Sequence, residues 1–375
     1  MNKLLLSLGL CWLLPIHLAQ ADTVRKECIG RLTFDVPEDM QWATYMSRDA
    51  FKITSTGGAH AFSDHVFTGG NKSGYDYDGL VIMVSDIVER SEFDGAARYA
   101  KGTRSLYQKS LIKELARKKD LLKELKTQEG TENTVKILRE NIAKTEHDIP
   151  LAHAYEHDLG IPDAYFLGSE DTVYDVLLWR KNRVYYFSLK GNDKNKSQRI
   201  KDLIARFQPR DLYEVPKGPG FCFPYGFIHD DGKTKYDIKN SLRFTREPNV
   251  IFTILNASAG DPYMKATSGT YNTDYNPGYD RENWEKTSFI ESLYFDRRLV
   301  GMDGWRLDPK PGSAEKERAW FGLAHIGGMT KPLIAIQAKT FKQGTDDLTG
   351  LTPPPEVLMP SLKALTKSMK LTLGE

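Results

Sequence analysis

The order of strands and helices that the sequence predicts occurs twice along the chain of 375 residues. In the first half, Leu32, Phe34 and Val36 alternate with polar residues, which predicts a half-buried strand. Further apolar runs predict strands at 80–87, 175–179 and 184–189, followed by a helix at 197–207. The repetition constrains the fold strongly, because each half then has to form a similar unit.

The second half follows a segment rich in Pro and Gly at 209–220. Strands are expected at 227–228, 250–255, 320–324 and 333–338, and a closing helix at 356–369. Hairpins prevail over regular alternation of strand and crossover helix, which indicates the α+β class. We therefore expect two similar domains, 22–215 and 216–375, each an antiparallel-rich sheet with helices.

The first half contains an additional segment at about 93–148. Apolar positions step by three and four on both sides of Gly130, for example at Leu111, Leu115 and Leu138. This spacing predicts an antiparallel helical hairpin inserted in the first domain. The basic run 117–119 shares its helix with acidic residues, so we interpret it as a solvated face with salt bridges.

The first 21 residues have the features of a cleavable signal peptide. Lys3 precedes an apolar stretch at 4–16, and Ala19 and Ala21 form an A-x-A cleavage site. The stretch is too short to cross a bilayer. We expect an exported, soluble, periplasmic protein without a membrane span.

Export changes the interpretation of the two cysteines that remain, Cys28 and Cys222. In an oxidising compartment they are either joined in a disulfide or are two buried thiols. Two cysteines alone do not make a structural zinc site.

Charge and motifs exclude several classes of function. Lys and Arg number 52 and Asp and Glu number 50, so the net charge of +2 does not indicate a nucleic-acid binder. The sequence has no P-loop, no G-x-G-x-x-G and no G-x-S-x-G, and the S-x-x-K match at 110–113 lacks its companion motifs. We expect no cofactor and no catalytic residues.

One metal-site pattern remains as an alternative. Residues 153–157 read H-x-x-E-H, which on a helix would direct His153 and His157 toward one zinc ion, with Glu156 as the base. The helix would be short and no third ligand is evident, so we predict no metal site. A zinc hydrolase stays an alternative function.

The segment 268–284 has the composition of a recognition surface. Rigid aromatic side chains and small polar residues are mixed there as in antibody paratopes. The candidate partner-binding residues are Tyr271, Asp274, Tyr275, Tyr279 and Trp284, with Tyr75 and Tyr77 as a weaker set in the first half. The alternative is a loop whose aromatic side chains fold back onto their own domain.

The two domain openings, 28–37 and 221–232, together with the segment 297–304, resemble type VI secretion immunity proteins that neutralise phospholipase effectors. The resemblance implies a periplasmic protein that grips a secreted lipase with two domains arranged like a claw, holds its lid region and blocks opening of the active site. It supplies no catalytic residues. We expect a monomer when free. A generic envelope binding module is the other alternative.

Overall fold

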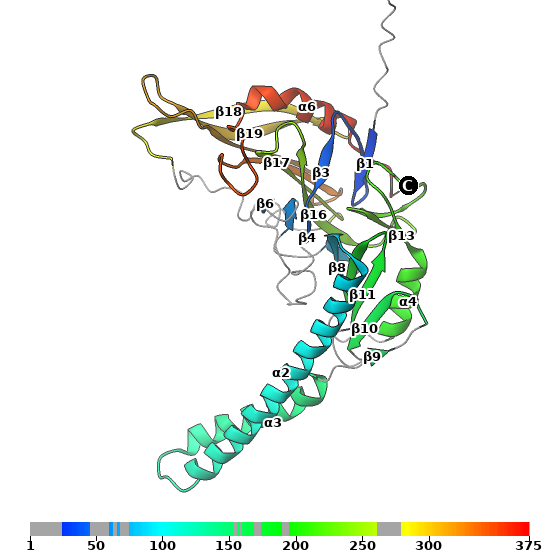
Figure 1. Cartoon of the computed structure of the whole chain (residues 1–375), viewed down its shortest axis with the longest axis vertical. Coiled ribbons are helices and arrows are strands. Elements are labelled where there is room, and N and C mark those ends of the chain that lie inside the picture. The colour runs from blue at the N-terminus through cyan, green and yellow to red at the C-terminus, as the bar shows by residue number, and fades with distance from the viewer. Residues whose placement is uncertain are drawn as a thin grey trace, which may run out of the picture.

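The computed structural model describes residues 25–45, 60–62, 66–67, 75–152, 156–157, 160–168, 174–189, 195–260 and 279–374. Antiparallel strands and a few helices dominate these residues, so the predicted α+β class is confirmed (Figure 1). The expected signal peptide lies outside the described residues. Among the described residues, no helix is both long and apolar enough to cross a membrane.

A single sheet of 16 strands runs through both halves of the sequence. Its main path has the order β18-β19-β20-β21-β17-β16-β7-β8-β12-β11-β10-β9. The first half supplies β7 (Tyr75–Tyr77), β8 (Leu80–Ile87), β9 (Glu156–His157), β10 (Ala164–Gly168), β11 (Tyr174–Arg180) and β12 (Arg183–Leu189). The second half supplies β16 (Tyr236–Phe244), β17 (Val250–Ala257), β18 (Trp284–Phe295), β19 (Arg298–Pro309), β20 (Ala319–Ile326) and β21 (Leu333–Thr340). Short strands β3 (Met40–Trp42), β4 (Thr44–Tyr45), β5 (His60–Phe62) and β6 (Val66–Phe67) lie beside this path.

The two halves of the path have the same internal order. From the middle outward, β7-β8-β12-β11-β10-β9 corresponds strand by strand to β16-β17-β21-β20-β19-β18. The halves meet edge to edge, where Tyr77 of β7 pairs with Tyr236 of β16. The repetition in the sequence is thus a repetition of topology, but within one continuous sheet. The domain boundary between residues 215 and 216 stays a prediction.

Two small sheets exchange strands between the halves. The hairpin β1 (Arg25–Ile29) and β2 (Leu32–Val36) is completed by β22 (Lys370–Leu371) from the end of the second half. Conversely, the hairpin β14 (Gly220–Phe223) and β15 (Gly226–His229) is completed by β13 (Phe207–Pro209), which ends the first half. Each half therefore supplies the last strand of a sheet that the other half begins.

Two amphipathic helices precede these exchanged strands. Helix α4 (Lys196–Arg206) buries Ile200 and Leu203, and α6 (Pro355–Ser368) buries Leu358, Leu362 and Leu365, positions three and four apart on one face. Helix α6 packs against β2 and β18, and α4 packs against β15. Both closing helices predicted from the sequence are therefore present.

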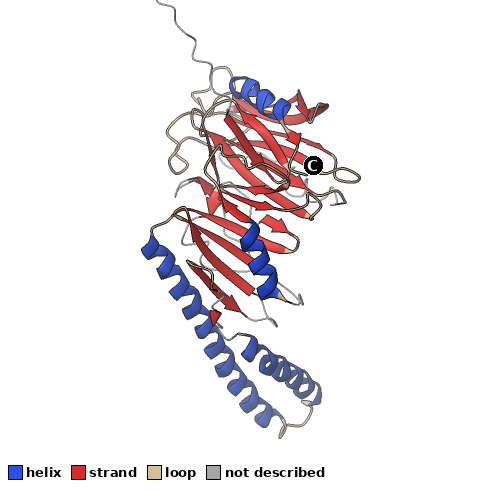
Figure 2. Cartoon of the chain, turned by 90° about the vertical axis from the view of Figure 1, so that its right-hand side faces the viewer, coloured by secondary structure: helices blue, strands red, loops and turns tan. Residues whose placement is uncertain are grey.

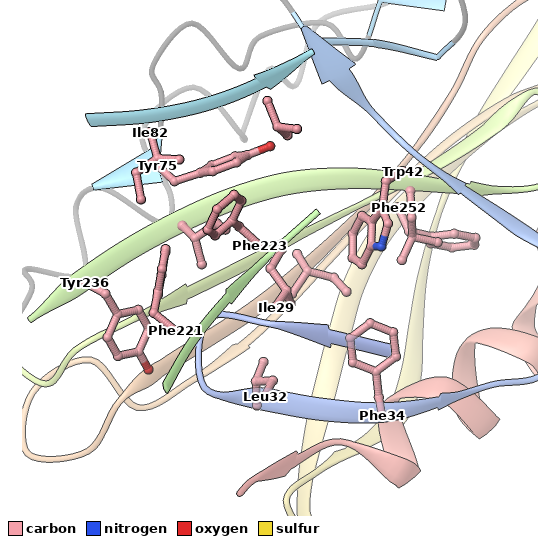
Figure 3. Packing of buried hydrophobic residues seen from close by; sticks show 14 of the residues in the cluster. Ile29, Leu32, Phe34, Trp42, Tyr75, Ile82, Phe221, Phe223, Tyr236 and Phe252 are labelled. Carbon is pink, nitrogen blue, oxygen red and sulfur yellow. The ribbon is translucent and has the colours of Figure 1, made fainter. Parts of the chain in front are cut away.

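The main core lies where the small hairpins meet the large sheet (Figure 3). Phe221 and Phe223 of β14 contact the rings of Tyr77 and Tyr75, with centroids 5.0 and 6.0 Å apart. On the other hairpin, the Phe34 ring lies edge-on to Trp42 at 6.3 Å. Aromatic pairs of this kind add to the stability given by apolar burial.

The predicted helical hairpin is confirmed and is longer than expected. Helix α2 (Arg90–Leu125) begins with a capping box between Glu89 and Glu92, and α3 (Glu132–Leu151) returns after a turn at Gly130, whose φ is +77°. The two helices extend away from the strands (Figure 2). We call these two helices the helical arm.

Candidate partner-binding surfaces

Two of the predicted contact residues, Tyr279 and Trp284, hold the start of β18 in place. Both are buried, and their rings lie edge to face with centroids 5.0 Å apart. The Tyr279 hydroxyl donates to the carbonyl of Arg318 at 3.1 Å, and Trp284 Nε1 donates to the carbonyl of Glu317 at 2.9 Å. Burial raises the pKa of Tyr279. For these two residues the aromatic side chains fold back onto their own domain, so their assignment to a partner is corrected.

Tyr75 and Tyr77 are likewise buried, with exposed fractions of 1% and 2%. They lie in β7, where the two halves of the sheet meet. The Tyr75 hydroxyl donates to Asn240 Oδ1 at 3.2 Å, and that of Tyr77 donates to Asp230 Oδ2 at 2.7 Å. These side chains join the halves and offer no exposed surface, so this part of the prediction is also corrected. Tyr271, Asp274 and Tyr275 lie outside the described residues.

A disulfide joins Cys28 of β1 to Cys222 of β14, with the two Cα atoms 5.8 Å apart. Beside it, Gly30 and Cys222 exchange backbone hydrogen bonds of 2.7 and 2.9 Å. Gly30 has φ of +61°, and a Cβ there would lie 2.2 Å from Asn256 Oδ1, so the close approach requires glycine. The bond thus links the hairpin β1–β2 covalently to the hairpin β14–β15.

Two buried ion pairs lie on either side of this link. Arg210 Nη2 donates to Glu27 Oε2 at 2.8 Å, and both side chains have zero exposure. Arg31 donates to both carboxylate oxygens of Asp230 at 2.6 Å, with each side chain 3% exposed. The Arg31–Asp230 pair connects the two halves. Glu27 and Arg210 both belong to the first half, and Arg210 also donates to the carbonyl of Phe223 in the second half at 3.3 Å.

The pKa of Asp230 is below its usual value of 3.8. Burial alone would raise this pKa, but the hydrogen bonds from Arg31, the Gly232 backbone N–H and Tyr77 favour the carboxylate and outweigh it. The buried charge is therefore stabilised by its partners within the chain, and its role in this arrangement is structural.

The H-x-x-E-H pattern does not lie on one helix. Helix α3 ends at Leu151, and Glu156 and His157 form strand β9, which pairs with Leu167 and Phe166 of β10. His153 lies outside the described residues. Among the described residues, no group of three or more His, Cys, Asp or Glu side chains is arranged to hold a metal ion. The helical geometry on which the zinc alternative depends is absent at Glu156 and His157.

The hairpin of β18 and β19 carries an exposed apolar face. Ile290, Tyr294 and Leu299 have exposed fractions of 76%, 45% and 61%. Tyr294 pairs directly with Leu299, and Ile290 pairs with Asp303, so all three side chains lie on the same face. The opposite face is buried at Leu293 and Met302, where α6 packs against β18. We call Ile290, Tyr294 and Leu299 the hairpin patch.

The helical arm is a second exposed element. Its helices contact one another through Leu111, Leu138 and Ile142, and Lys118 Nζ donates to Thr145 Oγ1 at 2.9 Å across the seam. Away from the seam, large apolar side chains remain exposed: Leu106, Tyr107, Ile112, Leu121 and Ile137. The arm and the β18–β19 hairpin extend from opposite ends of the molecule toward the same side (left in Figure 1).

The sequence contained a signal for the hairpin patch that composition alone does not reveal. In 287–294, apolar residues occur on both faces of the strand. Phe289 and Leu293 lie on one face, and Ile290 and Tyr294 lie on the other. A strand that is apolar on both faces and exposed on one indicates a contact surface. The segment 297–304, one of those that carry the family resemblance, forms the turn and the first part of β19.

Comparisons with known proteins agree with that resemblance. Residues 214–265 match the family model of the Tle cognate immunity protein 4 C-terminal domain, which confirms the resemblance at the second domain opening. No curated protein sequence shows a significant match to the chain.

Two solved structures resemble the chain at low identity. The first is the immunity protein TplEi of the type VI secretion system from Pseudomonas aeruginosa in complex with the "L" peptide, with a TM-score of 0.47, 12% identity and coverage of 93% of this chain and 98% of that chain. The second is the Tle4–Tli4 complex, with a TM-score of 0.46, 13% identity and coverage of 93% and 98%.

Proposed function

We propose that this chain, which carries the Tle cognate immunity protein 4 C-terminal segment at residues 214–265, is a periplasmic immunity protein that binds and inhibits a cognate type VI secretion phospholipase effector. The family match is the observation that carries the proposal. The matched residues include β14 to β17, Cys222 and Asp230. They include Cys222 and Asp230, through which the second half is joined to Cys28 and Arg31 of the first.

The position of the exposed elements supports a grip on the effector. The hairpin patch, at one end of the sheet, and the helical arm, which connects β8 to β9, extend toward one side of the molecule (Figure 1). The Arg31–Asp230 ion pair and the Cys28–Cys222 disulfide join the two halves, and the buried Arg210–Glu27 pair lies next to the disulfide, which favours a rigid connection between the two elements. A partner placed between them would contact both.

Inhibition then follows from binding one state of the lipase more tightly than another. If the protein holds the lid region in its closed position, the population able to admit substrate falls. A shift of the closed fraction from 1% to 99% requires a difference in binding free energy of about 5.5 kcal/mol. No bond is made or broken by this chain in such a mechanism. We propose that it is not an enzyme.

The test begins with a search for a lipase gene next to the gene for this chain, and then mixes the two purified proteins. We expect the two proteins to co-purify and the esterase activity of the lipase to fall when they are mixed. Cell fractionation should recover the chain with periplasmic proteins. A lipase that neither binds nor loses activity would contradict the proposed function.

A pair of variants tests the role of the hairpin patch. Ile290→Asp with Leu299→Asp places two charges on the exposed face and should weaken inhibition at least about tenfold, because buried apolar contacts with the partner are lost. The matched control is Leu351→Asp with Val357→Asp, at positions 45% and 50% exposed outside the patch. Thermal melting should be similar for both variants. Equal inhibition by the two variants would remove the hairpin patch from the interface while leaving the function intact.

A further inference from the structure

Charge is distributed unevenly between helix α2 and the rest of the chain. Helix α2 contains ten Lys and Arg residues and five Asp and Glu residues, a net charge of +5. The whole chain has a net charge of +2, so the remainder is negative by 3. The positive charge of this protein is therefore concentrated on one projecting helix.

Part of this charge is neutralised within the arm. Lys118 pairs with Glu114 at 2.6 Å and Lys119 pairs with Glu146 at 2.6 Å. Lys123 pairs with Asp120 at 3.2 Å. These contacts agree with the solvated, salt-bridged face that the sequence predicts for residues 117–119, except at Arg117.

Three other cations have no such neutralisation. Lys109, Lys113 and Arg117 are exposed and make no ion pair with any residue in the described part of the chain. Their spacing of four places them on one face of α2, turned away from the seam with α3. Like charges at this spacing weaken an isolated helix, so nothing within the arm itself accounts for them.

Two large apolar side chains flank these cations. Leu106 is 68% exposed and Leu121 is 45% exposed, and both lie on the same side of the helix as Lys113. We call Leu106, Lys109, Lys113, Arg117 and Leu121 the outer stripe. It combines positive charge with apolar contact at both ends.

We propose that the outer stripe docks on an acidic surface of the effector, an inference that rests on the proposed function. Charge complementarity identifies the partner, because an anionic surface would neutralise the three cations and accelerate association. An interfacial membrane helix instead requires a continuous apolar face. The apolar face of α2 is used against α3, and the outer stripe offers only two leucines, which favours a protein surface over a lipid surface.

The experiment compares two charge-reversed variants of the full chain. Lys113→Glu with Arg117→Glu alters the outer stripe. Lys136→Glu with Arg139→Glu makes the same change in net charge at exposed positions of α3. Association and dissociation rates are measured against the purified lipase from the neighbouring gene, at about 50 mM and about 500 mM salt.

We expect the outer-stripe variant to associate about tenfold more slowly at low salt and the α3 variant to change by less than about twofold. The difference should shrink at high salt, where charges are screened. Circular dichroism establishes that both variants retain their helices. Acidic-to-lysine substitutions in the lipase that restore the rate of the outer-stripe variant would identify the contacted surface.

Two outcomes would overturn the inference. One is that both variants associate with the lipase as fast as the unmodified chain does. The proposed function would then still hold, provided that the unmodified chain inhibits the lipase. The other is that the unmodified chain binds vesicles containing phosphatidylglycerol in a flotation assay and the outer-stripe variant does not, while both bind the lipase at the same rate. Failure of the unmodified chain to bind the lipase would instead contradict the proposed function.

Discussion

Replacing Arg210 with methionine should destabilise this protein more than most single substitutions. Arg210 contacts Glu27 through two hydrogen bonds of 3.0 and 2.8 Å, and neither side chain is exposed. At an effective dielectric constant of about 20, unit charges at this separation attract one another by roughly 6 kcal/mol. Arg210→Met removes this attraction and leaves the Glu27 carboxylate buried without its cation.

The expected loss is about 3–5 kcal/mol of unfolding free energy, the range typical of a broken buried pair. Glu27 retains hydrogen bonds from Trp42 Nε1 at 3.1 Å and from the Tyr213 backbone N–H, which keeps the cost within this range. The assay is urea unfolding followed by tryptophan fluorescence, with the disulfide intact.

A second substitution separates the charge from the packing. Glu27→Gln in the Arg210→Met background removes the unpaired charge but retains acceptor atoms for Trp42 and Tyr213, so it should recover at least half of the loss. Arg246→Met is the control, because the Arg246 side chain is 83% exposed and lies 4.0 Å from Glu38. It should change stability by less than about 0.5 kcal/mol. A loss below about 1 kcal/mol for Arg210→Met, or a double variant no more stable than the single one, would refute the reasoning.

Two further predictions concern the same junction. The double substitution Cys28→Ala with Cys222→Ala removes the disulfide between residues 194 positions apart. It should lower the unfolding free energy measured in urea by up to about 5 kcal/mol, because the unfolded chain gains conformational entropy. No measurable change in the unfolding free energy would contradict this argument. Because the pKa of Asp230 is lower when folded than when unfolded, its contribution to stability is present above pH 3.8 and is lost as the pH falls through the folded pKa. Asp230→Asn should therefore show a weaker loss of stability below pH 3.8 in acid titrations, and an unchanged slope would count against this assignment.

Much of the secondary structure could be predicted from the sequence, because the spacing of apolar residues within a single segment indicates a strand or a helix. The alternation at Leu32, Phe34 and Val36 and the helical spacing at Leu358, Leu362 and Leu365 are properties of single segments. The pairing of Leu32 with Leu371 involves residues 339 positions apart, and no local pattern encodes such a register. The single continuous sheet and the exchange of strands were inaccessible for this reason.

The candidate site was predicted less well. Tyr and Asp in alternation occur both in recognition loops and in buried strands whose hydroxyls find partners, and Tyr77 belongs to the second kind because Asp230 lies within hydrogen-bond distance. Ile290 and Leu299 show the reverse case: apolar residues of this kind are typical of a core, but both side chains are exposed. Their exposure depends on which face α6 covers, and this is a tertiary property.

The reciprocal completion of the two small sheets makes folding of either half conditional on the other. A fragment ending before residue 220 would hold β13 without the hairpin it completes, and a fragment beginning there would hold β22 without its own. A substitution that destabilises one half should therefore destabilise the other as well, and the two halves should unfold cooperatively. Under the function proposed above, each copy of the protein would then either bind the effector completely or not bind it at all.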